Sequence, residues 1–133
     1  MTFSIVAHCP QTGDLGIAVS TAIPAVGAIN PFARARVGAI ATQAVSNPYL
    51  GLDGLGLLAQ GLSATHVLDE LLRVDADREK RQLGIVDAQG NVAAFTGNEV
   101  QPWRGHHLGQ GYVVAGNLYT ALPYLDDLHP QRT

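Results

Sequence analysis

The chain has one cysteine, few charged residues and no long basic cluster. The single cysteine, Cys9, excludes an intrachain disulfide and a thiolate metal cage, and we expect neither a metal nor a cofactor. The net charge is −3, and the longest basic stretch is the short segment 78–81. We therefore expect no nucleic-acid partner, because such a partner requires a broad positive surface.

Long apolar segments are also missing. No run approaches the roughly 18 apolar residues that a membrane-spanning helix needs. The amino end has neither the charged region nor the apolar stretch of a secretory signal. We therefore expect no membrane association and a cytoplasmic location.

What the chain does contain is a large apolar fraction. Of its 133 residues 47% are apolar, 14% are charged and 15 are glycines. This composition predicts one domain, residues 1–133, with closely packed strands. So few charges also indicate further surface buried against another chain, and we expect a homo-oligomer.

Short apolar segments bounded by turn residues predict the strands. Two hairpins are expected, with corners at Gly13, which supplies a positive φ, and at Gly90. Apolar residues run on without alternation in the first hairpin, which predicts strands covered on both faces. The expected strands are residues 3–8, 15–21, 26–29, 37–44, 82–87, 91–96 and 112–115.

Apolar residues at spacings of three and four predict two helices between the hairpins. The first runs from Leu52 to Leu62, and the second follows Ser63 as its N-cap and includes 67–72. Prolines near the end restrict any closing helix to 121–128. Hairpins, further strands and two helices predict an α+β fold in which helices cover an antiparallel sheet.

Thr2 is a candidate nucleophile. An initiator methionine is usually removed before a residue as small as threonine, which makes Thr2 the amino terminus. Its hydroxyl can then attack a carbonyl while its own α-amine, with a pKa of about 7.7 to 8.0, takes up the proton. The alternative is that Thr2 only suits the β-propensity of the strand it opens. Ser4 is a weaker candidate, because it lies inside the strand without a nearby base.

Two adjacent histidines lie in a segment, 103–107, that is predicted to be an exposed loop. His106 is a candidate for substrate binding or for general base catalysis, and the alternative is a loop histidine with ordinary hydrogen bonds. No third ligand stands at a recognisable metal-binding spacing.

Three blocks of sequence carry a resemblance to a known family: TFSIVAHCPQTGDLGIAVST at the start, VGAINPFARARVGAIATQA at 26–44 and RQLGIVDAQGNVAAFTG at 81–97. With Gly116 and Asn117 after a strand, they are similar to the domain-of-unknown-function family 1028, DUF1028. The resemblance implies the fold of the N-terminal nucleophile (Ntn) hydrolases, an αββα sandwich of antiparallel sheets between helical layers. It also implies a fold shortened at its C-terminus, with the remainder lost or supplied by another polypeptide.

The resemblance further implies roles for residues at neighbouring strand ends. Thr2 takes the nucleophile position, with Gln43 or Asn117 donating to the developing oxyanion. Arg34 binds a substrate carboxylate or lowers the pKa of the attacking group. Structural alternatives are a surface ion pair for Arg34 and a left-handed turn for Asn117. The remaining substrate-binding candidates are Ser20, Thr42 and His106.

Together these features predict hydrolysis of an amide bond in a small molecule or short peptide, with Thr2 as the attacking residue. Two alternatives stay open. One is a catalytically silent protein that binds a small molecule in the same cleft, and the other is a structural subunit that completes a larger enzyme.

Overall fold

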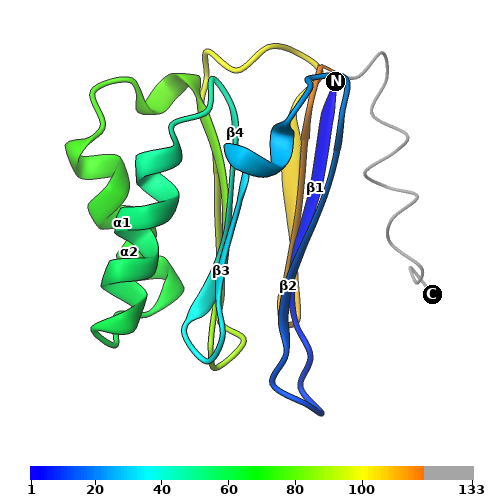
Figure 1. The fold of residues 1–133 in the computed structure, drawn as a ribbon. Helices are drawn as coiled ribbons and strands as arrows, with labels where there is room; N and C mark the ends of the chain where they lie inside the picture. Colours follow the sequence, from blue (N-terminus) through cyan, green and yellow to red (C-terminus); the bar gives the residue numbers. More distant parts are fainter. Residues whose placement is uncertain (119–133) are drawn as a thin grey trace.

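The computed structural model describes residues 1–118, which form two antiparallel sheets packed face to face with two helices outside one of them (Figure 1). One sheet has the strand order β2-β1-β8-β7 and the other β3-β4-β5-β6. The strands are β1 Thr2–His8, β2 Leu15–Thr21, β3 Pro31–Arg34, β4 Gly38–Ala44, β5 Arg81–Asp87, β6 Val92–Thr96, β7 Gly105–Gly109 and β8 Tyr112–Asn117. The helices are α1 Pro48–Ala59 and α2 Ala64–Val74, with short 3-10 turns η1 Val26–Ala28 and η2 Arg78–Lys80. The predicted α+β class is confirmed, as are the two helices on one sheet face.

The core has two layers, because alternate residues of the central strands face opposite ways. Ala41 of β4 packs with Val6 and Val113 between the two sheets. Ile40, its neighbour in the same strand, packs under the helices with Leu71. Strands β4 and β5 are therefore covered on both faces, and nearly all of their residues are buried.

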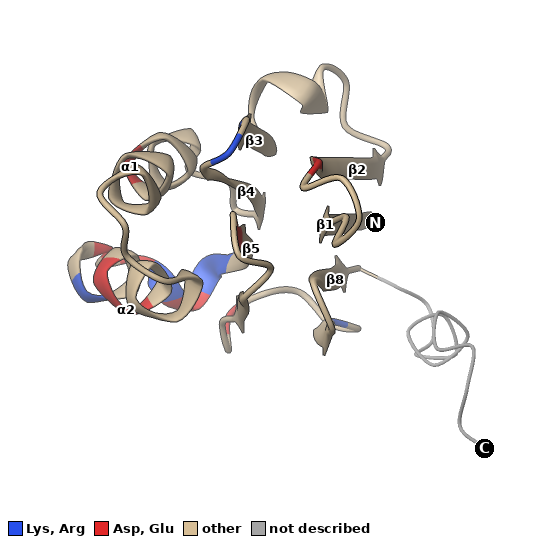
Figure 2. Cartoon of the chain, turned by 90° about the horizontal axis from the view of Figure 1, so that it is seen from below, with Lys and Arg blue, Asp and Glu red and all other residues tan. Residues whose placement is uncertain are grey.

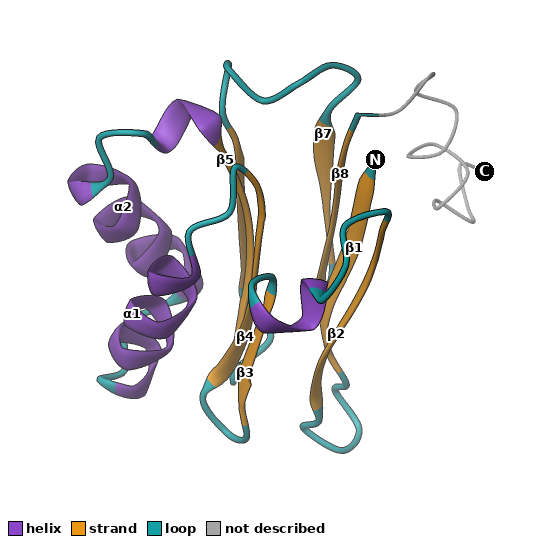
Figure 3. Cartoon of the chain, turned by 45° about the horizontal axis from the view of Figure 1, so that its top comes forward, coloured by secondary structure: helices purple, strands orange, loops and turns teal. Residues whose placement is uncertain are grey.

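The outer face of the first hairpin is not fully covered, so the prediction of two covered faces is wrong for β1 and β2. Every second residue of β2 is exposed, and the outward residues of β1 are half-buried. The outer face of this hairpin is not covered by a helix, because within residues 1–118 both helices lie against the other sheet (Figure 3). An uninterrupted apolar run does not reveal which sheet the helices will cover.

Local hydrogen bonds determine where the helices begin. Ser63 caps α2 as predicted, its hydroxyl accepting from a backbone amide of the first turn at 3.4 Å. The buried Asp87 carboxylate accepts from the Ala64 amide at 3.2 Å, which ties the start of α2 to the β5–β6 hairpin. Asn47 caps α1 and Pro48 follows it, so this helix begins earlier than the apolar spacing predicted.

Both predicted hairpin corners are confirmed, with φ of 76° at Gly13 and 81° at Gly90. Residues 26–29, predicted as a strand, contain the 3-10 turn η1 instead, because the chain crosses here from one sheet to the other. This arrangement leaves segment 26–29 without a neighbouring strand to pair with.

Two strands were missed. Strand β3 occupies part of the expected connection 30–36, and it begins with Pro31, which an edge strand tolerates because one side of it needs no N–H donor. Segment 103–107 was predicted to be a loop, but β7 starts at Gly105 and pairs with β8 as an edge strand. Glycine and histidine have little β-propensity, so pairing with β8 decides this structure.

Within residues 1–118, no helix combines the length and the apolar character needed to cross a membrane. The closing helix predicted for 121–128 lies outside the described residues.

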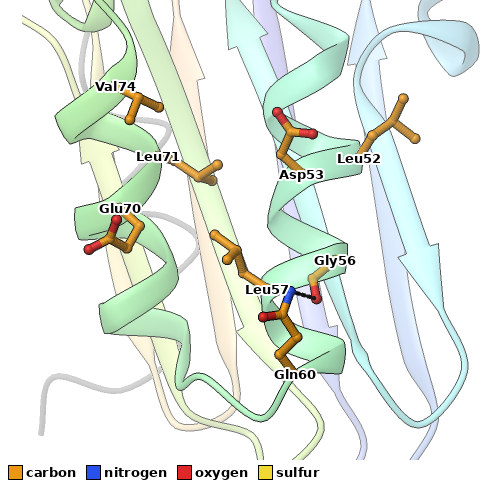
Figure 4. Close-up of a pocket in the computed structure, with 8 residues that line it drawn as sticks. All are labelled: Leu52, Asp53, Gly56, Leu57, Gln60, Glu70, Leu71 and Val74. Carbon is orange, nitrogen blue, oxygen red and sulfur yellow. Dashed lines mark hydrogen bonds between the residues drawn. The ribbon is translucent and has the colours of Figure 1, made fainter.

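A groove of about 400 Å³ lies between α1 and α2 on the outer surface (Figure 4). Leu52 and Val74 line it and are 54% and 67% exposed. The groove also contains two carboxylates, from Asp53 and Glu70, and its lining has no hydroxyl or thiol side chain. Such an apolar surface is compatible with the expected homo-oligomer, which stays a prediction.

Two glycines of α1 offer a matched test of the packing between helix and sheet. A Cβ on Gly54 would lie 2.5 Å from Cδ1 of Ile40, whereas one on Gly56 meets nothing within 4 Å. Both substitutions gain helix propensity, worth about 1 kcal/mol. We expect Gly56→Ala to raise the free energy of unfolding by up to about 1 kcal/mol, and Gly54→Ala to lower it by about 1 to 3 kcal/mol. Denaturant unfolding measures both, and equal stabilisation by the two variants contradicts this packing.

Candidate active site at the amino end of β1

Thr2 opens β1 with its side chain facing the space between the two sheets. Its exposed fraction is 7%, and its cross-strand neighbours are Thr21 of β2 and Asn117 of β8. The hydroxyl oxygens of Thr2 and Thr21 lie 3.0 Å apart, within hydrogen-bonding distance. The Thr21 oxygen also accepts from the Ile23 amide at 3.3 Å, so the hydroxyl beside Thr2 is itself held in place.

A pocket of about 380 Å³ lies next to Thr2. The amino end of the chain lies at the end of the sandwich where the chain crosses to β7 (Figure 3). Asn117 lines the pocket as well, and so does Met1, which is 61% exposed. The other lining residues are Ile23, Ala44, Val45, Lys80, Glu99, Val100, Gln101 and Leu118. A hydroxyl, a side-chain amide and an apolar wall therefore share one cavity.

Two residues of this pocket have a left-handed backbone conformation, which residues other than glycine rarely adopt. Ala44 has a φ of 71° and Leu118 a φ of 59°. Ala44 directly follows Gln43, and Leu118 directly follows Asn117. Such conformations cost free energy and tend to occur at functional sites. The backbone geometry therefore supports this pocket as the candidate site.

A fully buried side-chain amide, that of Gln82 in β5, lies one hydrogen bond behind the pocket. The two N–H groups of its Nε2 are shared among three acceptors: the backbone carbonyls of Gly105 and Gly116, each at 3.0 Å, and Oγ1 of Thr96 at 2.9 Å. Carbonyl oxygens can only accept, so these contacts determine which end of the amide is the nitrogen. Gln82 thereby connects strands of both sheets.

The orientation of Gln82 determines that of its neighbours. Its Oε1 accepts from Nε2 of Gln43 at 2.7 Å and from Nδ2 of Asn117 at 3.0 Å. Oε1 of Gln43 in turn accepts from Nδ2 of Asn30 at 3.3 Å. We call these four side chains, each at most 2% exposed, the amide row. Asn117 uses one of its two side-chain N–H groups for Gln82, so its second N–H and its Oδ1 are available to a molecule in the pocket.

Arg81, next to Gln82 in β5, faces the helix side and anchors the wall of the pocket. Its guanidinium donates to the Asp75 carboxylate at 2.8 and 3.3 Å and to the Val45 carbonyl at 2.8 Å. The hydrogen bond from Arg81 lowers the pKa of Asp75, and the same bond raises the pKa of Arg81. Because Val45 lines the pocket, this nearly buried ion pair holds that wall in position.

The structure brings three of the predicted residues together. Thr2 and Asn117 line the pocket, and Gln43 lies behind them with its Nε2 bonded to Gln82. The nucleophile role of Thr2 and the oxyanion roles of the two amides stay predictions.

Three other predicted residues lie outside this pocket. Ser20 is exposed on the outer face of β2, the face opposite to the one that carries Thr2. Thr42 is on the helix side of β4, where its hydroxyl donates to the Ile29 carbonyl at 2.8 Å. Arg34 is exposed at the other end of the sandwich. Neighbouring sequence positions on these strands face opposite ways, which a motif does not reveal.

His106 lies on β7, at the edge between the two sheets. Its Nδ1 is 2.8 Å from Oγ1 of Thr96, and that oxygen accepts from Gln82. Partial burial lowers the pKa of His106, and the charge of His107 acts in the same direction. A lowered pKa favours the neutral ring, whose Nδ1 can accept from the Thr96 hydroxyl. His106 is therefore connected to the amide row through Thr96.

Sequence reasoning assigned no role to two polar residues that shape this site: Asn30 and Gln82. Gln82 carried a usable signal, because it directly precedes the apolar run LGIV in a strand predicted to be buried, and a buried amide must have partners. Those partners were not readable, since Gln43 is 39 positions away in the sequence.

Comparison with known proteins gives two findings. A model of DUF1028, described as a family of unknown function, matches residues 2–129. The crystal structure of protein SPO2555 from Silicibacter pomeroyi, also of DUF1028, superposes with a TM-score of 0.84 at 34% sequence identity. The alignment covers 88% of this chain and 52% of that chain, so this chain spans about half the length of SPO2555. No match was found among curated proteins.

Replacing Gln82 tests the amide row. Gln82→Met keeps the size of the side chain but leaves buried N–H groups of Gln43 and Asn117 without an acceptor, and each such group costs about 1 to 3 kcal/mol. We expect the free energy of unfolding to fall by at least about 3 kcal/mol. The matched control is Gln89→Met at an exposed hairpin position, with an expected change within about 0.5 kcal/mol. Similar denaturation midpoints for both variants contradict the assigned contacts.

Proposed function

Because the chain belongs to DUF1028, a family of unknown function, we propose its activity from the chemistry of the pocket: Thr2 is an amino-terminal nucleophile that hydrolyses an amide bond of a small molecule or short peptide. The observation that carries this proposal is the inward Thr2 side chain, which lines a cavity of about 380 Å³ together with Asn117. The Ntn-hydrolase fold implied by the sequence resemblance is part of the proposal, including a helical layer on the β2-β1-β8-β7 sheet.

Removal of Met1 gives Thr2 a free α-amine beside its own hydroxyl. The amine, with a pKa of about 7.7 to 8.0, takes the hydroxyl proton while Oγ1 attacks the substrate carbonyl. The resulting ammonium gives that proton to the leaving amine, and an acyl ester remains on Thr2. Water, deprotonated by the same amine, then cleaves the ester and regenerates the threonine.

Two neighbours support this reaction in the proposed mechanism. The N–H of Asn117 that is not bonded to Gln82 donates to the oxyanion of the tetrahedral intermediate. The Thr21 hydroxyl, 3.0 Å from Oγ1 of Thr2, orients the attacking oxygen. Both residues are cross-strand neighbours of Thr2, so the sheet itself sets their spacing.

A second candidate function is binding of a small molecule without catalysis. The cavity of about 380 Å³ supports this function without any chemistry, and a Met1 peptide bond that is not cleaved leaves the Thr2 nitrogen as an uncharged amide. Mass spectrometry of the intact protein separates the two functions: retained Met1 supports binding alone. The structural-subunit alternative and the homo-oligomer stay predictions.

Substitution of Thr2 tests the nucleophile. Thr2→Ala removes the hydroxyl but keeps a small second residue, so Met1 is removed as before and the free amine is retained. We expect amide hydrolysis, measured as amine release from a panel of amides, to fall by roughly 10³-fold or more. Thr2→Ser retains part of the activity, and Thr65→Ala, on the exposed side of α2, leaves it unchanged. Equal turnover by the wild type and Thr2→Ala removes Thr2 from the mechanism.

The pocket wall predicts the kind of acyl group that is accepted. Ile23, Val45 and Leu118 line it with exposed apolar surface, and Lys80 is already paired with Asp77 at 2.8 Å. We expect kcat/KM to rise about fourfold for each CH₂ added to an uncharged acyl chain, until the cavity is filled. Val45→Asp is expected to abolish that dependence while leaving hydrolysis of the shortest amide nearly unchanged. A preference of the wild type for carboxylated acyl groups contradicts this prediction.

A further inference from the structure

A second pocket lies at the end of the sandwich opposite to Thr2, between the tips of the β1–β2 and β3–β4 hairpins. Its volume is about 370 Å³. The lining residues are Thr12, Gly13, Asp14 and Leu15 from one tip and Ala33, Arg34, Ala35 and Arg36 from the other. Figure 2, a view of this end, shows basic residues beside β3 and an acidic residue facing them at the start of β2. The two arginines belong to one turn.

These two arginines differ from the other basic residues of the described chain. Among residues 1–118, the remaining Lys and Arg side chains each have an ion-pair or hydrogen-bond partner: Arg73, Arg78, Lys80, Arg81 and Arg104. Arg34 and Arg36 have neither within residues 1–118, and both are exposed. In a chain with a net charge of −3, the two unpaired cations of the described part therefore line the same cavity.

Arg34 and Arg36 lie two positions apart on the turn that joins β3 and β4, and both line the cavity. The Val37 amide donates to the Arg34 carbonyl at 3.0 Å, and Arg36 has a left-handed φ of 63°. Two like charges on one turn repel each other, and an anion between them removes that repulsion. Asp14, on the opposite tip, forms no ion pair with them, and its carboxylate accepts from the Thr12 hydroxyl at 2.7 Å.

We propose that Arg34 and Arg36 form an anion-binding site, separate from the pocket next to Thr2, for a small molecule that carries a phosphate or dicarboxylate group. Guanidinium groups bind such oxyanions through paired, parallel N–H donors, and two of them match an anion with two negative charges. The cavity gives the rest of the ligand room between the hairpin tips. Asp14 at its edge disfavours a large polyanion, which makes a small ligand the better fit.

Sequence reasoning assigned Arg34 to a substrate carboxylate beside Thr2. The register of the sheet separates the two residues: Arg34 pairs with Gly38 at the start of β4, whereas Gln43, near Thr2, is close to the end of that strand. The arginine site therefore does not depend on the proposed hydrolase chemistry, and it can be tested without a substrate.

Nuclear magnetic resonance of the ¹⁵N-labelled chain provides the test, with the arginine Nε–Hε signals as the readout. Inorganic phosphate and succinate are titrated separately, and sodium chloride keeps the ionic strength constant. We expect saturable shifts of the Arg34 and Arg36 signals, with a dissociation constant on the order of 1 mM for phosphate. Saturation by phosphate alone assigns a phosphate group, and saturation by both anions assigns any compact dianion.

Matched double variants complete the test. Arg34→Gln with Arg36→Gln is expected to weaken phosphate binding at least about tenfold, whereas Arg73→Gln with Arg78→Gln, which changes the net charge equally, retains it. All four side chains are exposed, so both variants are expected to keep the wild-type fold, as checked by backbone amide spectra. Shifts that do not saturate in the wild type, or equal binding by the two double variants, overturn the proposal.

Discussion

The amide of Gln82 is the contact on which the arrangement of the candidate active site depends. Two acceptors of its nitrogen are backbone carbonyls of the opposite sheet, so the amide has one possible orientation. Its oxygen must then accept from Gln43 and Asn117, which sets the orientation of both. Each buried polar group left without a partner costs about 1 to 3 kcal/mol. Any other arrangement of these amides leaves several such groups without partners at once. The two sheets are thereby held in one relative position close to Thr2.

That position matters for the proposed hydrolysis because a nucleophile and an oxyanion donor must keep their spacing to within a fraction of an ångström. Adjacent residues of β5 provide this rigidity from its two faces. Gln82 holds Asn117 between the sheets, and Arg81 holds the carbonyl of Val45 on the helix side. A left-handed backbone at Ala44, between Gln43 and Val45, is tolerated because both of its neighbours are fixed in this way. Paired strands therefore hold Thr2 and Asn117 in the pocket, whereas most of the other lining residues belong to the connections between strands.

Local signals in the sequence predicted most of the fold, and the errors have a common physical cause. Apolar spacing, Ser63 as a cap and Gly13 at a corner act within a few residues, and the structure confirms them. Residues 26–29 and 105–107 were misassigned because their structure depends on which strand lies beside them. The candidate site shows the same limit. Thr2 is recognisable from its own chemistry, but the orientation of Asn117 depends on an amide 35 positions away.

The amide row also has a direction, which accounts for the state of His106. Its hydrogen bonds run one way, with donation from Asn30 to Gln43, from Gln43 to Gln82 and from Gln82 to Thr96. Aligned amides polarise one another, so each bond strengthens the next. Having accepted, the Thr96 hydroxyl is left to donate, and Nδ1 of His106 lies 2.8 Å away. A protonated His106 would present a second donor there, so the row favours the neutral ring, in the same sense as the partial burial that lowers the pKa of His106.

At its other end the amide row stops at Oδ1 of Asn30, a buried acceptor without a donor among residues 1–118. Neither Asn30 nor Thr96 lines the pocket next to Thr2, and the amide row reaches that pocket through Asn117.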